Sequence, residues 1–137
     1  MNYWLLKSEP SAYSWDRLVA DGRTEWNGVR NFQAAKNLKA MKRGDRAFFY
    51  HSGEGPAVVG VAEIVKEAYP DPSDESGRFV MVDVKAVMPV KKPVTLAAIK
   101  AEAKLKNLAL VRQGRLSVVP VSGEEWRVIA GMAGIKA

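Results

Sequence analysis

Five stretches of the chain have the hydrophobic and polar pattern of β-strands. Residues 3–7 form an aromatic and aliphatic run that stops at Ser8-Glu9-Pro10, and residues 78–87 alternate between two faces. The other three strands are predicted at residues 46–51, 57–65 and 115–121. Gly60 lies inside one of them, which predicts a bulge or a close approach of another part of the chain.

Four short helices are predicted from apolar residues that recur every three or four positions and from capping residues. They cover residues 14–21, 31–41, 96 to about 103, and the segment that follows residue 122. Ser14 and Gly22 suit the two ends of the first helix, Thr95 suits the start of the third, and Ser122 with Glu125 forms a capping box at the last. Residues 31–41 carry lysines between their apolar positions, so this helix has a basic outer face.

The order of these elements favours an α+β domain. Helices separate the strands at irregular intervals, without the repeating units of a doubly wound sheet. A barrel-like sheet fits better, because closure removes exposed edges that this short chain has few elements to cover. Since no linker or repeat is visible, one domain over residues 1–137 is predicted.

Composition excludes several kinds of chemistry. The 137 residues include no cysteine and one histidine, His51, so a disulfide scaffold, a thiolate metal site and a histidine-rich metal cage are excluded. We predict no metal and no other cofactor. No apolar run approaches the roughly 20 residues that span a bilayer, and the first residues do not resemble a signal peptide. We therefore expect a cytoplasmic protein with no membrane partner.

Charge makes nucleic acid the leading class of partner. Lys and Arg number 21 against 15 Asp and Glu, which gives a net charge of +6 and a pI near 9.7. The densest positive stretch is residues 30–46, where Asp45 is the single acid. A solvated helix face would explain these charges, and neutralisation of phosphates is the alternative. The predicted phosphate-binding residues are Arg30, Lys36, Lys39, Lys42, Arg43 and Arg115.

Polar and aromatic residues lie together at three predicted element ends, near residues 7–9, 26–31 and 50–52. An extruded nucleobase needs flat apolar surfaces for stacking and a few fixed hydrogen-bonding groups. Trp26 and Tyr50 would supply the surfaces. For Trp26 two positions stay open: core packing, which is the commoner fate of tryptophan, and a surface turn, which the following Asn-Gly favours. The predicted base pocket comprises Lys7, Ser8, Trp26, Val29, Asn31, Tyr50, His51 and Ser52.

No catalytic motif is found. Phosphate-loop and dinucleotide fingerprints are absent, and no Gly-x-Ser-x-Gly motif surrounds a serine. His51 is interpreted as a structural imidazole. The alternative makes it the general acid or base, beside Ser52 and Glu54, of a small enzyme that acts on a nucleoside or another small ligand.

The string Asn2-Tyr3-Trp4-Leu5-Leu6-Lys7-Ser8-Glu9-Pro10, together with residues 26–34, resembles the EVE domain family. Further motifs follow in the family's order at residues 41–45, 49–52, 60–63, 69–72 and 115–121, so the resemblance covers essentially the whole chain. It implies a PUA-like mixed β-pseudobarrel of about five or six strands flanked by short helices. Such domains are related to the YTH and ASCH domains and hold a modified nucleobase in a concave pocket.

The resemblance also bears on individual residues. Lys7-Ser8, Trp26 and residues 49–52 lie where the similar YTH domains place their base-binding residues. This chain has Asn31-Phe32-Gln33-Ala34-Ala35-Lys36 where Asn-Tyr-Gln-Ala-Arg-Asn is usual in the family. Ala35 stands at the position of that arginine, so the guanidinium that a bidentate phosphate contact would need is missing.

Three hypotheses follow from the sequence. The first is a non-enzymatic reader that binds DNA or RNA with a modified base, and the second is the small enzyme with His51. The third is a protein-interaction scaffold, whose loop at Tyr69-Pro70-Asp71-Pro72 would meet a partner. The sequence leaves open the polymer and the modification.

Overall fold

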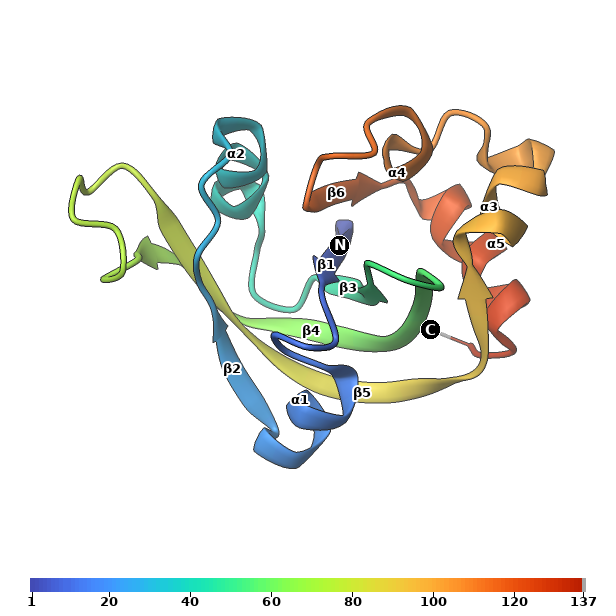
Figure 1. Cartoon of the computed structure of the whole chain (residues 1–137), viewed down its shortest axis with the longest axis horizontal. Helices are drawn as coiled ribbons and strands as arrows, with labels where there is room; N and C mark the ends of the chain where they lie inside the picture. Colours follow the sequence, from blue (N-terminus) through green and yellow to red (C-terminus); the bar gives the residue numbers. More distant parts are fainter. Residues whose placement is uncertain (137) are drawn as a thin grey trace.

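A mixed six-stranded sheet forms the centre of the protein (Figure 1). The computed structural model describes residues 1–136. The strands are β1 (Tyr3–Ser8), β2 (Arg23–Trp26), β3 (Arg46–His51), β4 (Ala57–Pro70), β5 (Val80–Thr95) and β6 (Val118–Val121). Their order in the sheet is β2-β5-β4-β3-β1-β6, in which β1 and β3 are parallel and every other pair is antiparallel.

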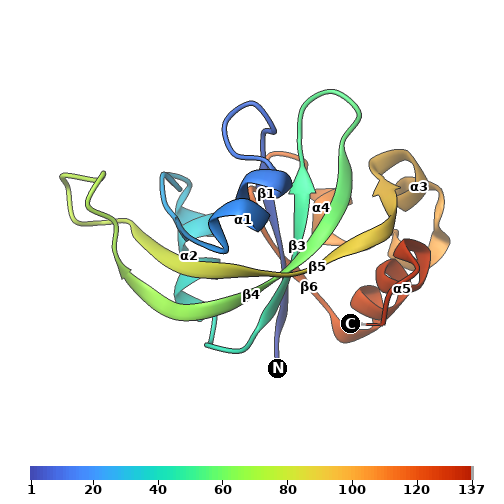
Figure 2. The same ribbon diagram turned by 90° about the horizontal axis from the view of Figure 1, so that it is seen from below.

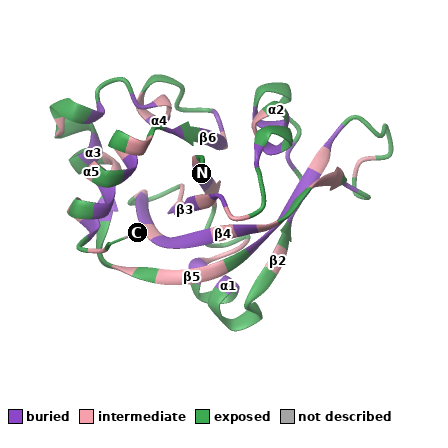
Figure 3. Cartoon of the chain, turned by 180° about the vertical axis from the view of Figure 1, so that it is seen from behind, coloured by how far each residue is buried: buried purple, intermediate pink, exposed green. Residues whose placement is uncertain are grey.

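Short helices surround the sheet, with α2 at one end and α3, α4 and α5 gathered at the other (Figures 1 and 3). The helices are α1 (Trp15–Asp21), α2 (Phe32–Ala40), α3 (Leu96–Ala101), α4 (Ala109–Arg112) and α5 (Gly123–Ala133), with a 3-10 turn at Ala103–Leu105. Their apolar faces point inward, so that Leu38 of α2 and Trp126 and Ile129 of α5 are fully buried. No helix within residues 1–136 has the length and apolar character needed to cross a bilayer.

The sheet curls because its two longest strands bend. Between β4 and β5 the register shifts at four places, and such irregularities increase the local bend and twist (Figure 2). The curling brings edge strand β2 back over β3, although two strands separate them in the sheet. The Trp26 ring of β2 lies 5.5 Å from the Phe49 ring of β3, edge to face. The ends of β1 and β2 therefore meet around one opening.

Gly60 is the point where α1 packs against the sheet. The register shifts there, between Val58 and Gly60, and a Cβ built on Gly60 would lie 2.5 Å from the Trp15 ring. The irregularity predicted at this glycine is confirmed, and the group that approaches it closely is a side chain rather than backbone. The missing side chain is what lets the indole lie flat on β4.

Most predicted elements are confirmed, including the capping residues. Ser14, Thr95 and Ser122 each accept a backbone N–H at the start of their helix. Strands β4 and β5 are longer than predicted, because they continue as a two-stranded ribbon. The ribbon is held by backbone pairing, which leaves no apolar pattern in the sequence from which to predict it. Tyr69 and Pro70 thus belong to β4, contrary to the predicted loop. Strand β2 and helix α4 were not predicted, and β6 begins at Val118 rather than at residue 115.

Candidate functional site

A cavity of about 470 Å³ opens where the ends of β1 and β2 face each other. Its size lies within the range of ligand-binding pockets, roughly 300–1,000 Å³. Two stretches of chain form its walls: residues 8–15, which we call the Tyr13 wall, and residues 27–31, the Arg30 wall. The lining residues are Lys7, Ser8, Ala12, Tyr13, Thr24, Glu25, Trp26, Asn27, Gly28, Val29, Arg30 and Ser117.

Trp26 provides the aromatic surface of this cavity. It is the last residue of β2 and is 8% exposed, so of the two positions left open by the sequence the structure shows core packing rather than a surface turn. Tyr13 meets the indole edge-on at 6.4 Å. The indole N–H has no hydrogen-bond partner, yet among residues 1–136 no fully buried side-chain nitrogen or oxygen lacks one. The N–H of Trp26 is therefore a free donor that reaches the surface at the cavity.

Uncharged groups hold the Tyr13 wall in place. The Ser8 hydroxyl donates to the Tyr13 carbonyl at 2.6 Å, and the backbone N–H of Trp15 donates to Nε2 of His51 at 3.0 Å. Burial lowers the pKa of His51 and outweighs the opposing charge of Asp16. An imidazole that accepts at Nε2 is neutral and carries its proton on Nδ1. His51 is thus a structural acceptor in this fold.

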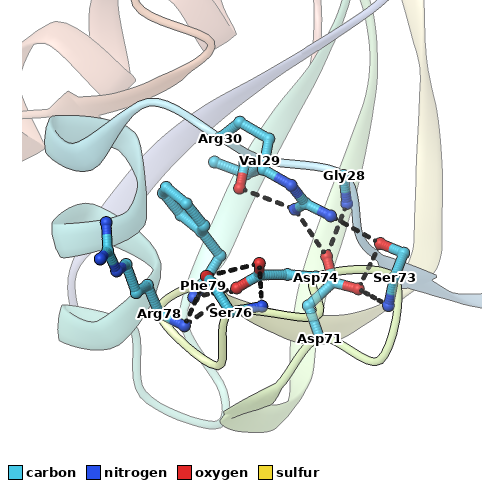
Figure 4. A network of polar contacts seen from close by, with 9 residues as sticks. All are labelled: Gly28, Val29, Arg30, Asp71, Ser73, Asp74, Ser76, Arg78 and Phe79. Carbon is cyan, nitrogen blue, oxygen red and sulfur yellow. Dashed lines mark hydrogen bonds and ion pairs between the residues drawn. The ribbon is translucent and has the colours of Figure 1, made fainter.

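A buried carboxylate holds the Arg30 wall (Figure 4). Oδ2 of Asp71 accepts from the Gly28 N–H at 2.8 Å and from Arg30 at 3.2 Å, while Oδ1 accepts from the Ser73 N–H and hydroxyl at 2.8 and 2.6 Å. Burial alone would raise the pKa of Asp71. The hydrogen bonds from Ser73, Gly28 and Arg30 outweigh it and lower that pKa to about 2.

A second carboxylate ties the same loop to β5. Asp74 accepts from the hydroxyl of Ser76 and from the N–H groups of Ser76, Arg78 and Phe79, bonds that lower its pKa to about 2 (Figure 4). Phe79 in turn stacks on Phe32, with ring centroids 5.1 Å apart. The sequence analysis did not identify Asp71 or Asp74 as part of the site. The available signal was a serine two residues after each aspartate, a spacing typical of Asx turns.

The predicted base-pocket residues do not all lie together. Lys7, Ser8, Trp26 and Val29 line the cavity described above. Tyr50 and Ser52 line a second hollow of about 240 Å³. The predicted pocket between the rings of Trp26 and Tyr50 is therefore not formed. Successive side chains of a strand point to opposite faces, so Tyr50 points away from Trp26 because Phe49 packs against it.

The two remaining predicted residues have structural roles. His51 supports Trp15 and lines neither hollow. Asn31 caps α2 by accepting the N–H of Ala34 at 2.9 Å, and it lines a third hollow of about 270 Å³ together with Arg115.

The predicted phosphate-binding residues are all exposed, but their side chains differ in their contacts. Arg30 is bound to Asp71 and Ser73, as described. The other side chains make no hydrogen bond or ion pair within residues 1–136; these are Lys36, Lys39, Lys42, Arg43 and Arg115. Asp45, the acid of this stretch, is 3% exposed and accepts from Asn2, Trp4 and Lys42. Within residues 1–136 it forms no ion pair, so the cations of this stretch are not paired with it.

No group of three or more His, Asp or Glu residues that could hold a metal ion is found in the described part of the chain. The exposed chemistry of the region consists of a free indole donor, ring surfaces and unpaired cations. Such an arrangement binds flat heterocycles and anions.

Comparison with known proteins gives consistent matches. The family described as "EVE domain" matches residues 2–132. Thymocyte nuclear protein 1 of Homo sapiens is 36% identical over 165 aligned positions, which cover 96% of this chain and 73% of that protein. The NMR structure of Rpa0253 from Rhodopseudomonas palustris is 57% identical, with a TM-score of 0.93, over 98% of this chain and 94% of that one.

Two complexes are also similar. The crystal structure of human THYN1 with DNA containing 5-methylcytosine is 35% identical, with a TM-score of 0.91, over the full length of both chains. A YTH domain from Zygosaccharomyces rouxii, solved with N6-methyladenosine RNA, has a TM-score of 0.60 at 17% identity, over 96% of this chain and 86% of that one. The latter likeness concerns the fold alone. Together they confirm the predicted α+β, PUA-like pseudobarrel.

Proposed function

Since this chain belongs to the EVE domain family, we propose that it is a nucleic-acid reader without catalytic activity. It holds one extruded, modified nucleobase in the cavity beside Trp26, while exposed basic side chains bind the phosphates around the opening. The complex of human THYN1 with DNA containing 5-methylcytosine makes methylated cytosine in DNA the first ligand to test.

The free N–H of Trp26 is the observation that carries this proposal. A buried indole usually finds a hydrogen-bond partner in the protein, whereas this one keeps its donor for the cavity. The pyrimidine ring of a cytosine offers acceptors at O2 and N3 for such a donor. Val29, which is 7% exposed and lines the same cavity, provides an apolar contact for a methyl group.

Phosphate binding is proposed for the cations that are free in the fold. The side chains of Lys36, Lys39, Lys42, Arg43 and Arg115 make no other polar contact within residues 1–136. They can neutralise phosphates without breaking a structural interaction, and their contribution would be independent of sequence. Arg30 lines the cavity but is already bound to Asp71, so we assign it a positioning role in addition to its charge.

Anisotropy titrations with matched oligonucleotides test the proposal. DNA and RNA strands carrying 5-methylcytosine or cytosine are compared over a range of salt concentrations. We expect tighter binding of the methylated strand and a steep loss of affinity with salt. Trp26→Phe, which keeps a ring but removes the N–H, should weaken binding of both strands and leave the salt slope unchanged, because cytosine and 5-methylcytosine share the O2 and N3 acceptors.

A double variant with Lys36→Gln and Lys39→Gln is the complementary control. It should flatten the salt slope by about 0.9 for each phosphate that is no longer neutralised, while the preference for the methylated base is retained. Absent binding, binding that does not respond to salt, or an affinity for the methylated strand that survives both Trp26→Phe and Trp26→Ala would each contradict the proposal.

The enzyme alternative has little geometric support. His51 is the only imidazole, and its Nε2 is occupied by the Trp15 N–H. Under the reader proposal, His51→Gln should leave base preference in place. The scaffold alternative has less support, because Asp71 in the loop that would meet a partner is buried and not available for contact. The single-domain extent and the cytoplasmic location stay predictions.

A further inference from the structure

A second hollow lies on the other side of Lys7 from the Trp26 cavity. It has a volume of about 240 Å³ and is formed by the end of β3, the loop that follows, α3 and α4. Lys7 lines both hollows, so they adjoin at this side chain. We call the second one the Tyr50 hollow.

Tyr50 lines this hollow, and its hydroxyl makes no hydrogen bond within residues 1–136. Its side chain is almost entirely buried, since the residue is 2% exposed. The hydroxyl has no hydrogen-bond partner, yet no fully buried polar side-chain atom within residues 1–136 lacks one. The hydroxyl therefore lies at the small exposed part of the residue, which is the hollow. A phenol that is buried to this extent usually has its O–H satisfied by the protein, so the free group indicates a ligand.

The charge of the hollow is entirely positive. Lys7 and Lys100 are its ionisable residues besides Tyr50, and no carboxylate lines it. Nζ of Lys7 donates to the carbonyl of Gly114 at 2.8 Å and lies 6.0 Å from the centre of the Tyr50 ring. Lys100 is exposed and makes no polar contact in the described part of the chain. An ammonium group has three donor hydrogens, so Lys7 retains two for an anion.

The remaining lining is apolar, apart from Ser52. Pro56, Leu96, Leu110 and Val111 contribute to it. A ligand that suits the hollow thus combines a flat or apolar body, a group that hydrogen-bonds with a phenol, and a negative charge. A nucleotide unit has all three.

We propose that the Tyr50 hollow is a second subsite, which takes the nucleotide next to the base held in the Trp26 cavity. The phosphodiester that joins the two nucleotides lies at Lys7, the side chain that the two hollows share. The inference rests on the proposed function, because it needs a base in the first cavity to fix the register. It adds that the protein binds a dinucleotide step rather than a single nucleoside, and that the step has a direction.

Short ligands of defined direction test this subsite. The ligands are 5-methyl-2′-deoxycytidine alone and two dinucleotides, in which the methylated base stands at the 5′ or at the 3′ position. Calorimetry or NMR titration of the full chain measures each affinity. We expect one dinucleotide to bind about tenfold more tightly than the nucleoside, as one added charge-assisted contact would give.

Two substitutions should remove this gain. Tyr50→Phe keeps the ring and deletes the hydroxyl, and Lys100→Gln deletes a charge; each should cost the favoured dinucleotide about threefold to tenfold in affinity. Neither should change the affinity for the nucleoside. Lys106→Gln is the matched control, because Lys106 is an exposed lysine nearby that lines neither hollow, and it should leave the gain intact.

Each result decides the proposal. The second subsite is refuted if neither dinucleotide exceeds the nucleoside, if the gain survives both substitutions, or if Lys106→Gln removes as much of it as Lys100→Gln. A free deoxynucleoside monophosphate that binds through Tyr50 as tightly as the linked unit would also refute it, in favour of an independent mononucleotide site. If the gain depends on Tyr50 but methylated and unmethylated dinucleotides bind equally, the subsite stands and the reader function fails.

Discussion

The two walls of the Trp26 cavity face each other but are held by different forces. The part-buried contacts of the Tyr13 wall are made by uncharged groups: the His51 imidazole, the Ser8 hydroxyl and the indole of Trp15 laid on Gly60. Its hydrogen bond to a carboxylate, from the Tyr13 hydroxyl to Asp21 at 2.8 Å, is exposed. The Arg30 wall rests on the ionised Asp71, which is bound by Gly28, Arg30 and Ser73. The Tyr13 wall is therefore weakened by a change in side-chain volume or by protonation of His51. The Arg30 wall is weakened when Asp71 loses its charge. The two sides of one cavity can therefore be loosened separately.

The largest effect is expected from filling the space under the Tyr13 wall. Gly60→Ala places a methyl group where the Trp15 ring lies, 2.5 Å away, so the indole and α1 must shift. We expect a loss of about 3 kcal/mol in the free energy of unfolding, measured by denaturant titration. Gly131→Ala is the matched control, because that glycine lies in α5 with open space around it. It should stabilise the protein slightly. Equal effects of the two substitutions would contradict the account of Gly60.

A smaller effect is expected at the Arg30 wall. Asp71→Asn keeps the shape but replaces a carboxylate oxygen by an N–H donor, which faces donors of Gly28, Arg30 or Ser73. The expected loss of unfolding free energy is about 2 kcal/mol. Asp74→Asn, in the same loop but more exposed, should cost less. The comparison fails if Asp74→Asn is the more damaging of the two in thermal unfolding.

The smallest effect is a dependence on pH that separates the walls. Because the pKa of His51 is lowered from 6.5 in the fold, the neutral imidazole contributes full stability above pH 6.5. That contribution, about 1 kcal/mol for one hydrogen bond, is lost as the pH falls through the lower folded pKa. The contribution of Asp71 is full above 3.8 and is lost only as the pH falls towards about 2.

Amide hydrogen exchange distinguishes these two ranges. Between pH 7 and pH 5, after correction for intrinsic rates, the Trp15 amide should lose protection while the Gly28 amide keeps it. In His51→Gln, which does not titrate, this change at Trp15 should disappear. Parallel loss of protection at both amides would show that the two walls are one cooperative unit.

What the sequence predicted depends on how local each signal is. Ser14, Thr95 and Ser122 were assigned correctly at the helix starts, since a cap involves residues only three positions apart. Strand β2 was missed because Arg23-Thr24-Glu25 has no apolar pattern. As an edge strand it needs only β5 as a partner.

The site shows the same limit. The polar and aromatic ends of β1 and β2 were identified, and Ser8 and Trp26 do line one cavity. The position of Tyr50 was not predicted. It depends on the alternation of side chains along β3, in which the preceding residue, Phe49, already faces Trp26. Asp71 lies 41 positions from Arg30, and only the curl of β4 and β5 brings the two together.

The curl of the sheet also decides what fixes the width of the opening. Trp26, which lines the opening, is held against β3 by its contact with the ring of the buried Phe49, and no ladder of backbone hydrogen bonds joins β2 to β3. Ring contacts weaken gradually with distance, whereas a ladder breaks all at once. The size of the side chains at this contact can therefore set the width of the opening. Related sequences can then admit heterocycles of different size while the backbone stays the same.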